Sequence, residues 1–241
     1  MNTLIVPDIH ERLDRLTRLL QDHIEKADRV VFLGDWFDAF GVVDLHRVGQ
    51  ICQFINGHID GITHEGRTIP VTFLLGNHDC HYFFSHGGFK CSGYNHQKWE
   101  VIDTNVPDGI REKFQISTTV GPYRVSHAGY TEATLPYCRP EVEKEALAAA
   151  FAGEFDPLFG AGHARGGSQL IGGPTWLDWN NEFEHIEDYP QIVGHTEGKD
   201  VRVKGGLAAQ HNSYCLDTGL RHCLFVDEVT GVVTIKSLET P

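Results

Sequence analysis

Residues 30–38 of the chain read VVFLGDWFD, an apolar run that stops at a glycine and an aspartate. Four consecutive apolar residues that end at a turn are typical of a buried strand. Two further stretches have the same form: residues 3–10 read TLIVPDIH, and residues 71–79 read VTFLLGNHD. Each stretch therefore predicts a buried strand that ends in polar side chains.

Segments with helical periodicity separate these three predicted strands. Within residues 13–24, and again within residues 45–55, apolar residues recur every three or four positions. This spacing places them on one face of an amphipathic helix. The alternation of strand and helix predicts an α/β fold whose sheet has parallel central strands.

The second half of the chain has shorter elements. It predicts a hairpin from residues 114–119 and 123–126, a helix over 141–152, a glycine-rich loop over 160–174, and strands over 191–193, 213–216, 223–226 and 232–235. The chain has no internal repeat, heptad pattern or linker composition. We therefore expect residues 1–241 to form a single domain.

Composition excludes several classes of protein. The formal net charge of −13 opposes stable binding to nucleic acid and to anionic membranes. No apolar stretch approaches the roughly 20 residues that a membrane span needs, and the first residues do not resemble a signal peptide. The six cysteines have no CxxC spacing, so we expect reduced thiols. These features together predict a soluble, cytoplasmic protein.

Five of the predicted strands end in side chains that commonly bind metals. In open α/β sheets, ligands bind beyond the carboxyl ends of the strands, so these groups can converge on one point. Their mixture of carboxylate, imidazole and carboxamide groups favours Mn²⁺, Fe or Zn²⁺ over Ca²⁺ or Mg²⁺. The residues are Asp8 with His10, Asp35, Asn77 with His78, His127, and His195.

At these positions the sequence resembles the calcineurin-like metallophosphoesterase family. The family's blocks occur in order as DIH at 8–10, GDWFD at 34–38, GNHD at 76–79, SHA at 126–128 and GHT at 194–196, and CLDTG at 215–219 is similar to its closing strand. The resemblance is closest to the phage and bacterial protein phosphatases and diadenosine tetraphosphatases, in which a threonine also follows the last histidine. It implies a four-layer αββα sandwich with mixed sheets and a dinuclear metal site at the carboxyl ends of the strands.

The resemblance also implies a role for each matching residue. Asp8, His10 and Asp35 would hold one metal ion, and Asp35, Asn77, His127 and His195 the second. The ions would be manganese, with iron, zinc or nickel as alternatives. They would activate a water molecule for attack on phosphorus. His78 would protonate the leaving group, and Asp38 would orient His78.

The chain departs from the family's pattern at three positions. Ala39 and Asn181 stand where many protein phosphatases have arginines that bind phosphate, so the substrate contact expected at Asn181 is weaker. Arg165 in the glycine-rich loop is a candidate substitute. Glu197 replaces a metal-binding histidine of the nuclease-like branches, and is either a ligand or a solvent-facing loop residue. The histidine-rich and aromatic segment 80–108 is either a substrate wall or a packed surface loop.

The main functional hypothesis is a metal-dependent phosphatase. Its substrate would be a phosphoprotein or a small phosphorylated metabolite. The missing arginines favour the alternative of a phosphodiesterase or a dinucleoside polyphosphate hydrolase, since such a substrate depends less on a cationic clamp. A third hypothesis, from another class, is a binding module that keeps the fold without turnover.

Overall fold

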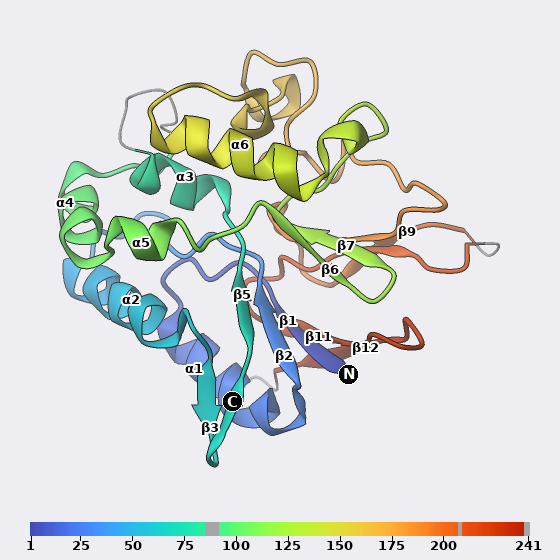
Figure 1. The fold of residues 1–241 in the computed structure, drawn as a ribbon, viewed down its shortest axis with the longest axis horizontal. Coiled ribbons are helices and arrows are strands. Elements are labelled where there is room, and N and C mark those ends of the chain that lie inside the picture. Colours follow the sequence, from blue (N-terminus) through green and yellow to red (C-terminus); the bar gives the residue numbers. More distant parts are fainter. Residues whose placement is uncertain (85–91, 207–208, 239–241) are drawn as a thin grey trace.

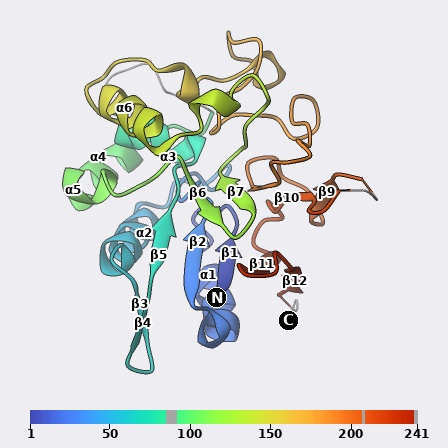
Figure 2. The same ribbon diagram turned by 45° about the vertical axis from the view of Figure 1, so that its right-hand side comes forward.

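The computed structural model describes residues 1–84, 92–206 and 209–238, and its main feature is a pair of five-stranded sheets (Figure 1). The first sheet contains, in spatial order, β12 (Val233–Ser237), β11 (His222–Asp227), β1 (Asn2–Val6), β2 (Arg29–Phe32) and β5 (Val71–Phe73). The second contains β6 (Ser117–Val120), β7 (Tyr123–Ser126), β8 (Gln191–Val193), β10 (Ser213–Cys215) and β9 (Arg202–Lys204). Figure 2 shows the same ribbon from a second direction, with β1, β2 and β5 of the first sheet and β9 and β10 of the second labelled.

Both sheets are mixed. β1, β2 and β5 run parallel, as the three apolar stretches predicted, while β11 and β12 are antiparallel to their neighbours. In the second sheet, β8 is parallel to both β7 and β10. Parallel neighbours place their carboxyl ends at one edge, and this edge carries the polar side chains described below.

Side chains that alternate along each strand separate two regions of the core. Leu4 and Val30 pack against the helices, whereas their neighbours Ile5 and Val31 pack between the sheets. This alternation follows from the two-residue period of a strand, which directs successive side chains to opposite faces. Ile5 and Val31 meet residues such as Val125 of the second sheet, so the predicted sandwich is confirmed.

Two helices, α1 (Leu13–His23) and α2 (Leu45–His58), pack on the outer face of the first sheet. The other helices are α3 (Asn77–Phe83), α4 (His96–Asn105), α5 (Asp108–Arg111) and α6 (Pro140–Phe151), of which α3 and α6 lie beyond the carboxyl ends of the strands (Figure 1). Short 3-10 turns lie at Ile24–Lys26, Leu135–Tyr137, Pro157–Phe159 and His163–Arg165. The outer face of the second sheet is covered differently. There Leu177, Trp179 and Phe183 pack on Val193 and Cys215 from a segment made only of turns.

Several elements differ from the sequence-based expectations. The hairpin of β3 (Ile62–His64) and β4 (Arg67–Ile69) and the short strand β9 were not predicted. Segment 80–108 is largely helical, because it contains the end of α3 and all of α4. Residues 85–91 of that segment lie outside the described residues. Among the residues that are described, no helix is long and apolar enough to cross a membrane. Cys52, Cys138, Cys215 and Cys223 are free thiols.

Candidate active site

Two loops cross closely at the carboxyl edge of the first sheet, and the crossing requires glycine on both sides. Gly34 follows β2 with φ +102°, and a Cβ placed on it would lie 2.4 Å from the backbone nitrogen of Gly76. A Cβ on Gly76 would meet the carboxylate of Asp35. No larger residue fits at either position. The crossing brings Asp35, after β2, beside Asn77, at the start of α3.

Asp79 fixes this crossing through its carboxylate. The backbone nitrogens of Asp35 and Gly76 donate to its Oδ2 at 2.8 and 2.9 Å, and that of Trp36 donates to its Oδ1 at 2.8 Å. Burial, with Asp35 nearby, raises the pKa of Asp79 to about 7. Asp79 therefore supports the crossing of the two loops through its carboxylate.

The predicted metal ligands lie together around Asp35. Its Oδ2 is 3.4 Å from Nε2 of His127 and 3.6 Å from Nε2 of His10. His127 Nε2 is also 3.1 Å from Oδ1 of Asn77 and 3.2 Å from Nδ1 of His195. Three histidines and Asn77, from four different segments of the chain, therefore gather around Asp35.

These residues form two groups that share one carboxylate. Potential ligand atoms of Asp8, His10 and Asp35 lie within 4.8 Å of one another, and so do those of Asp35, His127 and His195. A shared carboxylate between two three-residue groups is the arrangement that a pair of bridged cations needs.

Hydrogen bonds to backbone carbonyls orient two of the imidazoles. Nδ1 of His127 donates to the carbonyl of Leu33 at 2.8 Å. Nδ1 of His10 lies 3.1 Å from the carbonyls of Phe37 and Asp38. A carbonyl only accepts, so Nδ1 carries a proton and Nε2 is the ring nitrogen that faces Asp35. This second-layer arrangement is usual for metal-binding histidines.

Two buried polar atoms of the cluster have no hydrogen-bond partner among the described residues. They are Oδ2 of Asp8 and Nε2 of His195. Burial raises the pKa of Asp8 well above its usual value, with Asp217 adding to the effect, and burial lowers the pKa of His195 well below its usual value. A buried carboxyl oxygen and a buried imidazole nitrogen that lack hydrogen-bond partners fit a bound cation.

Charge within the cluster is otherwise balanced by close pairs. Burial opposes the charge of Asp35, but His127 and His78 outweigh it and hold the pKa of Asp35 well below its usual range. Burial lowers the pKa of His127, but Asp35 and Asp8 outweigh that effect and raise it to about 9. The donor set of carboxylates, imidazoles and one amide suits a transition metal.

Backbone strain is concentrated at the same edge. Among the described residues, the non-glycine residues with positive φ are His10, Glu11, Asp35, Asp38, Glu65, His195 and Leu220. Five of these seven belong to the metal cluster or to its immediate surroundings. Such conformations persist only where the surrounding contacts enforce them, and they gather at functional sites.

His78 and Asp38 form a close pair next to the cluster. Nδ1 of His78 lies 2.9 Å from Oδ2 of Asp38, and both side chains are buried. His78 also lines a cavity of about 350 Å³ that reaches His10, Asp35 and His195. The two side chains predicted as a proton donor and its partner therefore contact each other, and His78 lines the cavity.

The walls of this cavity contain residues that sequence reasoning missed. They are Arg12, Phe40, Trp176 and Asp217, whereas Ser92, which also lines the cavity, belongs to the segment 80–108 that was a candidate substrate wall. Arg12 follows His10 by two residues, and its guanidinium makes no hydrogen bond or ion pair with any described residue. The only signal for Arg12 in the sequence was its closeness to the DIH block. Glu197 also lines the cavity. The sequence alone did not decide whether it is a ligand or a solvent-facing loop residue.

The two candidate substrate residues are placed differently. Arg165 lines the cavity, with its Nε 2.8 Å from Oδ2 of Asp178 and its Nη2 donating to Oγ1 of Thr196 at 2.7 Å. Asn181 is exposed and lines another cavity, and its amide donates to Oδ1 of Asp178 at 2.8 Å. Asn181 therefore touches the partner of Arg165 rather than the metal cluster. Ala39 and Asn181 replace arginines of the family pattern and so predicted a cavity with little positive charge. Arg12 and Arg165 nevertheless place two guanidinium groups on its wall.

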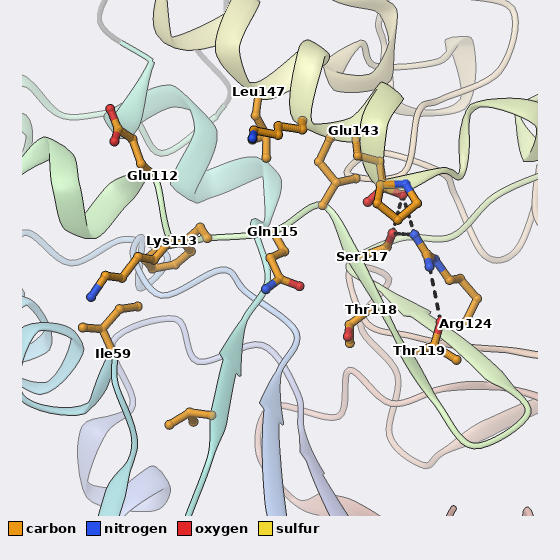
Figure 3. A pocket seen from close by; sticks show the side chains of 15 residues that line it. Ile59, Glu112, Lys113, Gln115, Ser117, Thr118, Thr119, Arg124, Glu143 and Leu147 are labelled. Atoms are coloured by element: carbon orange, nitrogen blue, oxygen red, sulfur yellow. Dashed lines mark hydrogen bonds and ion pairs between the residues drawn. The ribbon is translucent and has the colours of Figure 1, made fainter.

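A larger cavity, of about 760 Å³, lies between α6 and the facing edges of the two sheets (Figure 3). Three of its charged side chains, those of Lys113, Arg124 and Glu143, have a partner of opposite charge. Arg124 donates to Oε1 of Glu143 at 2.7 Å and also to Ser117, and Lys113 binds Asp60 at 2.6 Å. None of the predicted ligands lines this cavity.

Comparisons with known proteins agree with this geometry. The family model described as calcineurin-like phosphoesterase matches residues 1–196. None of the curated proteins compared with the chain matches its sequence. A protein-tyrosine phosphatase of the psychrophile Shewanella sp. is similar in structure, with a TM-score of 0.59 and 17% identity over 99% of this chain and 80% of that one. A protein serine/threonine phosphatase from Saccharomyces cerevisiae has a TM-score of 0.54 and 11% identity, over 100% of this chain and 81% of that one. At these identities the likeness shows the fold alone.

Proposed function

Because the chain belongs to the calcineurin-like phosphoesterase family, and is a hydrolase of phosphoric ester bonds, we propose that it is a dinuclear-metal phosphatase acting on phosphate monoesters. The observation that carries the proposal is the pair of ligand groups that share Asp35, beside a cavity with two arginines on its wall. A monoester dianion has the charge to use both arginines. The substrate would be a phosphoprotein or a small phosphorylated metabolite.

Each residue of the cluster has a proposed role. One cation would be held by Asp8, His10 and Asp35, and the other by Asp35, Asn77, His127 and His195. When bound, the two cations supply an activated water nucleophile and neutralise charge on the phosphoryl oxygens. We propose manganese, with iron, zinc or nickel as alternatives, because the donor set mixes nitrogen and oxygen.

His78 is proposed as the general acid. Asp38 accepts the proton of Nδ1, so Nε2 is the nitrogen that donates to the leaving oxygen. The pair holds the proton at a defined atom on the cavity wall.

We also propose a domain organisation, a location and a range of partners. The shared core between the sheets supports a single domain over residues 1–241, and the free thiols support a cytoplasmic location. The net charge of −13 supports the absence of stable nucleic-acid or membrane binding.

Removal of the metal should abolish activity and destabilise the protein. Without cations, Asp8 and His195 keep buried atoms that lack partners. We expect dialysis against a chelator to end hydrolysis of p-nitrophenyl phosphate and to lower the thermal midpoint, and Mn²⁺ to restore both best. A ligand at 1,000 times its dissociation constant stabilises by about 4 kcal/mol, so calorimetry will resolve the shift. Full activity in metal-free protein, verified by elemental analysis, would contradict the mechanism.

Arg165 should bind the phosphate group. Its removal in Arg165→Ala should lower kcat/KM for monoesters by about 10- to 100-fold, the worth of one charge-assisted contact, and should affect diesters less. Asn181→Ala should have a smaller effect, because Asn181 acts only through Asp178. Arg221→Ala is the matched control, since Arg221 is exposed and outside the cavity. Equal losses on both ester classes would remove Arg165 from phosphate binding.

A second candidate function is hydrolysis of diesters or dinucleoside polyphosphates. The observation in its favour is that Asp178 already pairs with Arg165, which reduces the charge available to a dianion. Steady-state assays with p-nitrophenyl phosphate, bis-p-nitrophenyl phosphate, phosphopeptides and dinucleoside polyphosphates separate the two candidates. A higher kcat/KM on the last substrates than on monoesters would favour the second.

A further inference from the structure

The carboxylate of Asp38 is held on both of its oxygens. Oδ2 lies 2.9 Å from Nδ1 of His78 and 2.8 Å from Nε2 of His81. Oδ1 accepts a hydrogen bond of 2.6 Å from the hydroxyl of Tyr82 and lies 3.3 Å from Nζ of Lys98. An aspartate that only formed the turn after β2 would need none of these four partners.

Lys98 is the unusual member of this set. It comes from α4, 60 residues further along the chain, and its side chain is only 2% exposed. Nζ also donates to Oε1 of Glu11 at 2.6 Å, and the Glu11 side chain is fully buried. Lysine is almost never buried to this degree without a paired charge.

Glu11 holds the same aspartate by its backbone. Oε1 of Glu11 accepts a hydrogen bond of 2.9 Å from the backbone nitrogen of Asp38. Glu11 and Asp38 both have positive φ, at 58° and 67°, a conformation that a non-glycine residue keeps only where its surroundings enforce it. Glu11 therefore fixes the main chain of Asp38, and Lys98 fixes its side chain.

Stability alone does not account for such an arrangement. A buried ion pair adds little to folding stability compared with apolar residues of similar volume. Its effect here is geometric: Lys98 and Tyr82 occupy Oδ1, so the carboxylate cannot rotate and Oδ2 stays on His78. Fixed second-layer partners are a common means of orienting a reacting group.

We propose that the buried Glu11–Lys98 pair is a positioning device for proton transfer, which holds Asp38 so that His78 points its donor nitrogen at the leaving group. The proposal rests on the phosphatase function proposed above. Neither Glu11 nor Lys98 lines the cavity, and the side chains of both contact Asp38.

The test compares two leaving groups in Lys98→Met, which removes the ammonium group and keeps the length of the side chain. An alkyl phosphate needs a proton on its leaving oxygen, whereas p-nitrophenyl phosphate does not. We expect kcat to fall by about 10- to 100-fold on the alkyl ester and much less on the nitrophenyl ester, with KM and metal content unchanged. Lys113→Met is the matched control, because Lys113 is partly exposed and pairs with Asp60.

A double-variant cycle with His78→Ala separates positioning from a merely structural role. If Lys98 acts through His78, Lys98→Met should cause no further loss in the His78→Ala background. A further loss there, or equal losses on both esters in the single variant, would overturn the proposal. Should Lys98→Met fail to fold, Tyr82→Phe removes the other Oδ1 contact without loss of volume and should show the same leaving-group dependence. If His78→Ala itself loses equally on both esters, the acid role fails and this proposal fails with it.

Discussion

Replacing Asp35 with asparagine should empty the metal centre. Asp35 is the one carboxylate common to both ligand groups, and its low pKa keeps it charged. Asparagine has the same shape but half of its oxygen donors and no charge. We expect elemental analysis to show loss of both cations, and kcat/KM for p-nitrophenyl phosphate to fall by more than about 100-fold, beyond the usual effect of losing a second-layer partner.

The control for this variant is Asp60→Asn, the same change on a surface residue that pairs with Lys113. It should leave metal content and turnover as they are. Wild-type metal content in Asp35→Asn would contradict the bridging role, even if turnover were reduced.

The second large effect is expected for His78→Ala. Loss of a general acid should lower kcat for alkyl phosphates by about 10²–10⁴-fold. Metal content should stay unchanged, because His78 points its Nδ1 at Asp38 rather than at the ligand groups. The loss on p-nitrophenyl phosphate should be far smaller, since its leaving group departs as a stable anion. A series of aryl phosphates of graded leaving-group acidity measures the difference.

His96→Ala supplies a matched control, because His96 is an exposed histidine of α4. It should behave as the wild type on every ester. If His78→Ala gave parallel losses across the whole series, His78 would have a role other than proton donation.

The sequence predicted what depends on local pattern. Continuous apolar runs fixed the positions of β1, β2 and β5, and the polar residues after them had to meet because parallel strands end at one edge. The family match and the two-sheet fold confirm the family and the fold class that these runs predicted.

Contacts between segments that are distant in the chain could not be predicted from the sequence. Lys98 binds Asp38 across 60 residues, and nothing in the pattern of α4 marks it as a buried lysine. Arg12 joins the cavity because of the turn after β1, and the three-residue strands β3, β4 and β9 are too short for a periodic signal. Asn181 was placed by resemblance, but Asp178 stands between it and the cavity.

The segment that packs on the outer face of the second sheet should differ in hydrogen exchange from the strands of the first sheet. On one side of the metal edge, the Gly34–Gly76 crossing is enclosed by backbone and by Asp79. On the other, turns rather than helix cover the sheet, and this segment supplies Trp176 and the Asp178 that holds Arg165. The backbone N–H groups of this segment donate to turn carbonyls and to side chains, such as Gly172 to Glu182 and Trp179 to Thr196, rather than to a helix or a sheet. We therefore expect amide hydrogens of 171–183 to exchange with solvent sooner than those of β1 and β2. Such a result would give the cavity one wall held by the glycine crossing and a second wall held by turns and side-chain contacts.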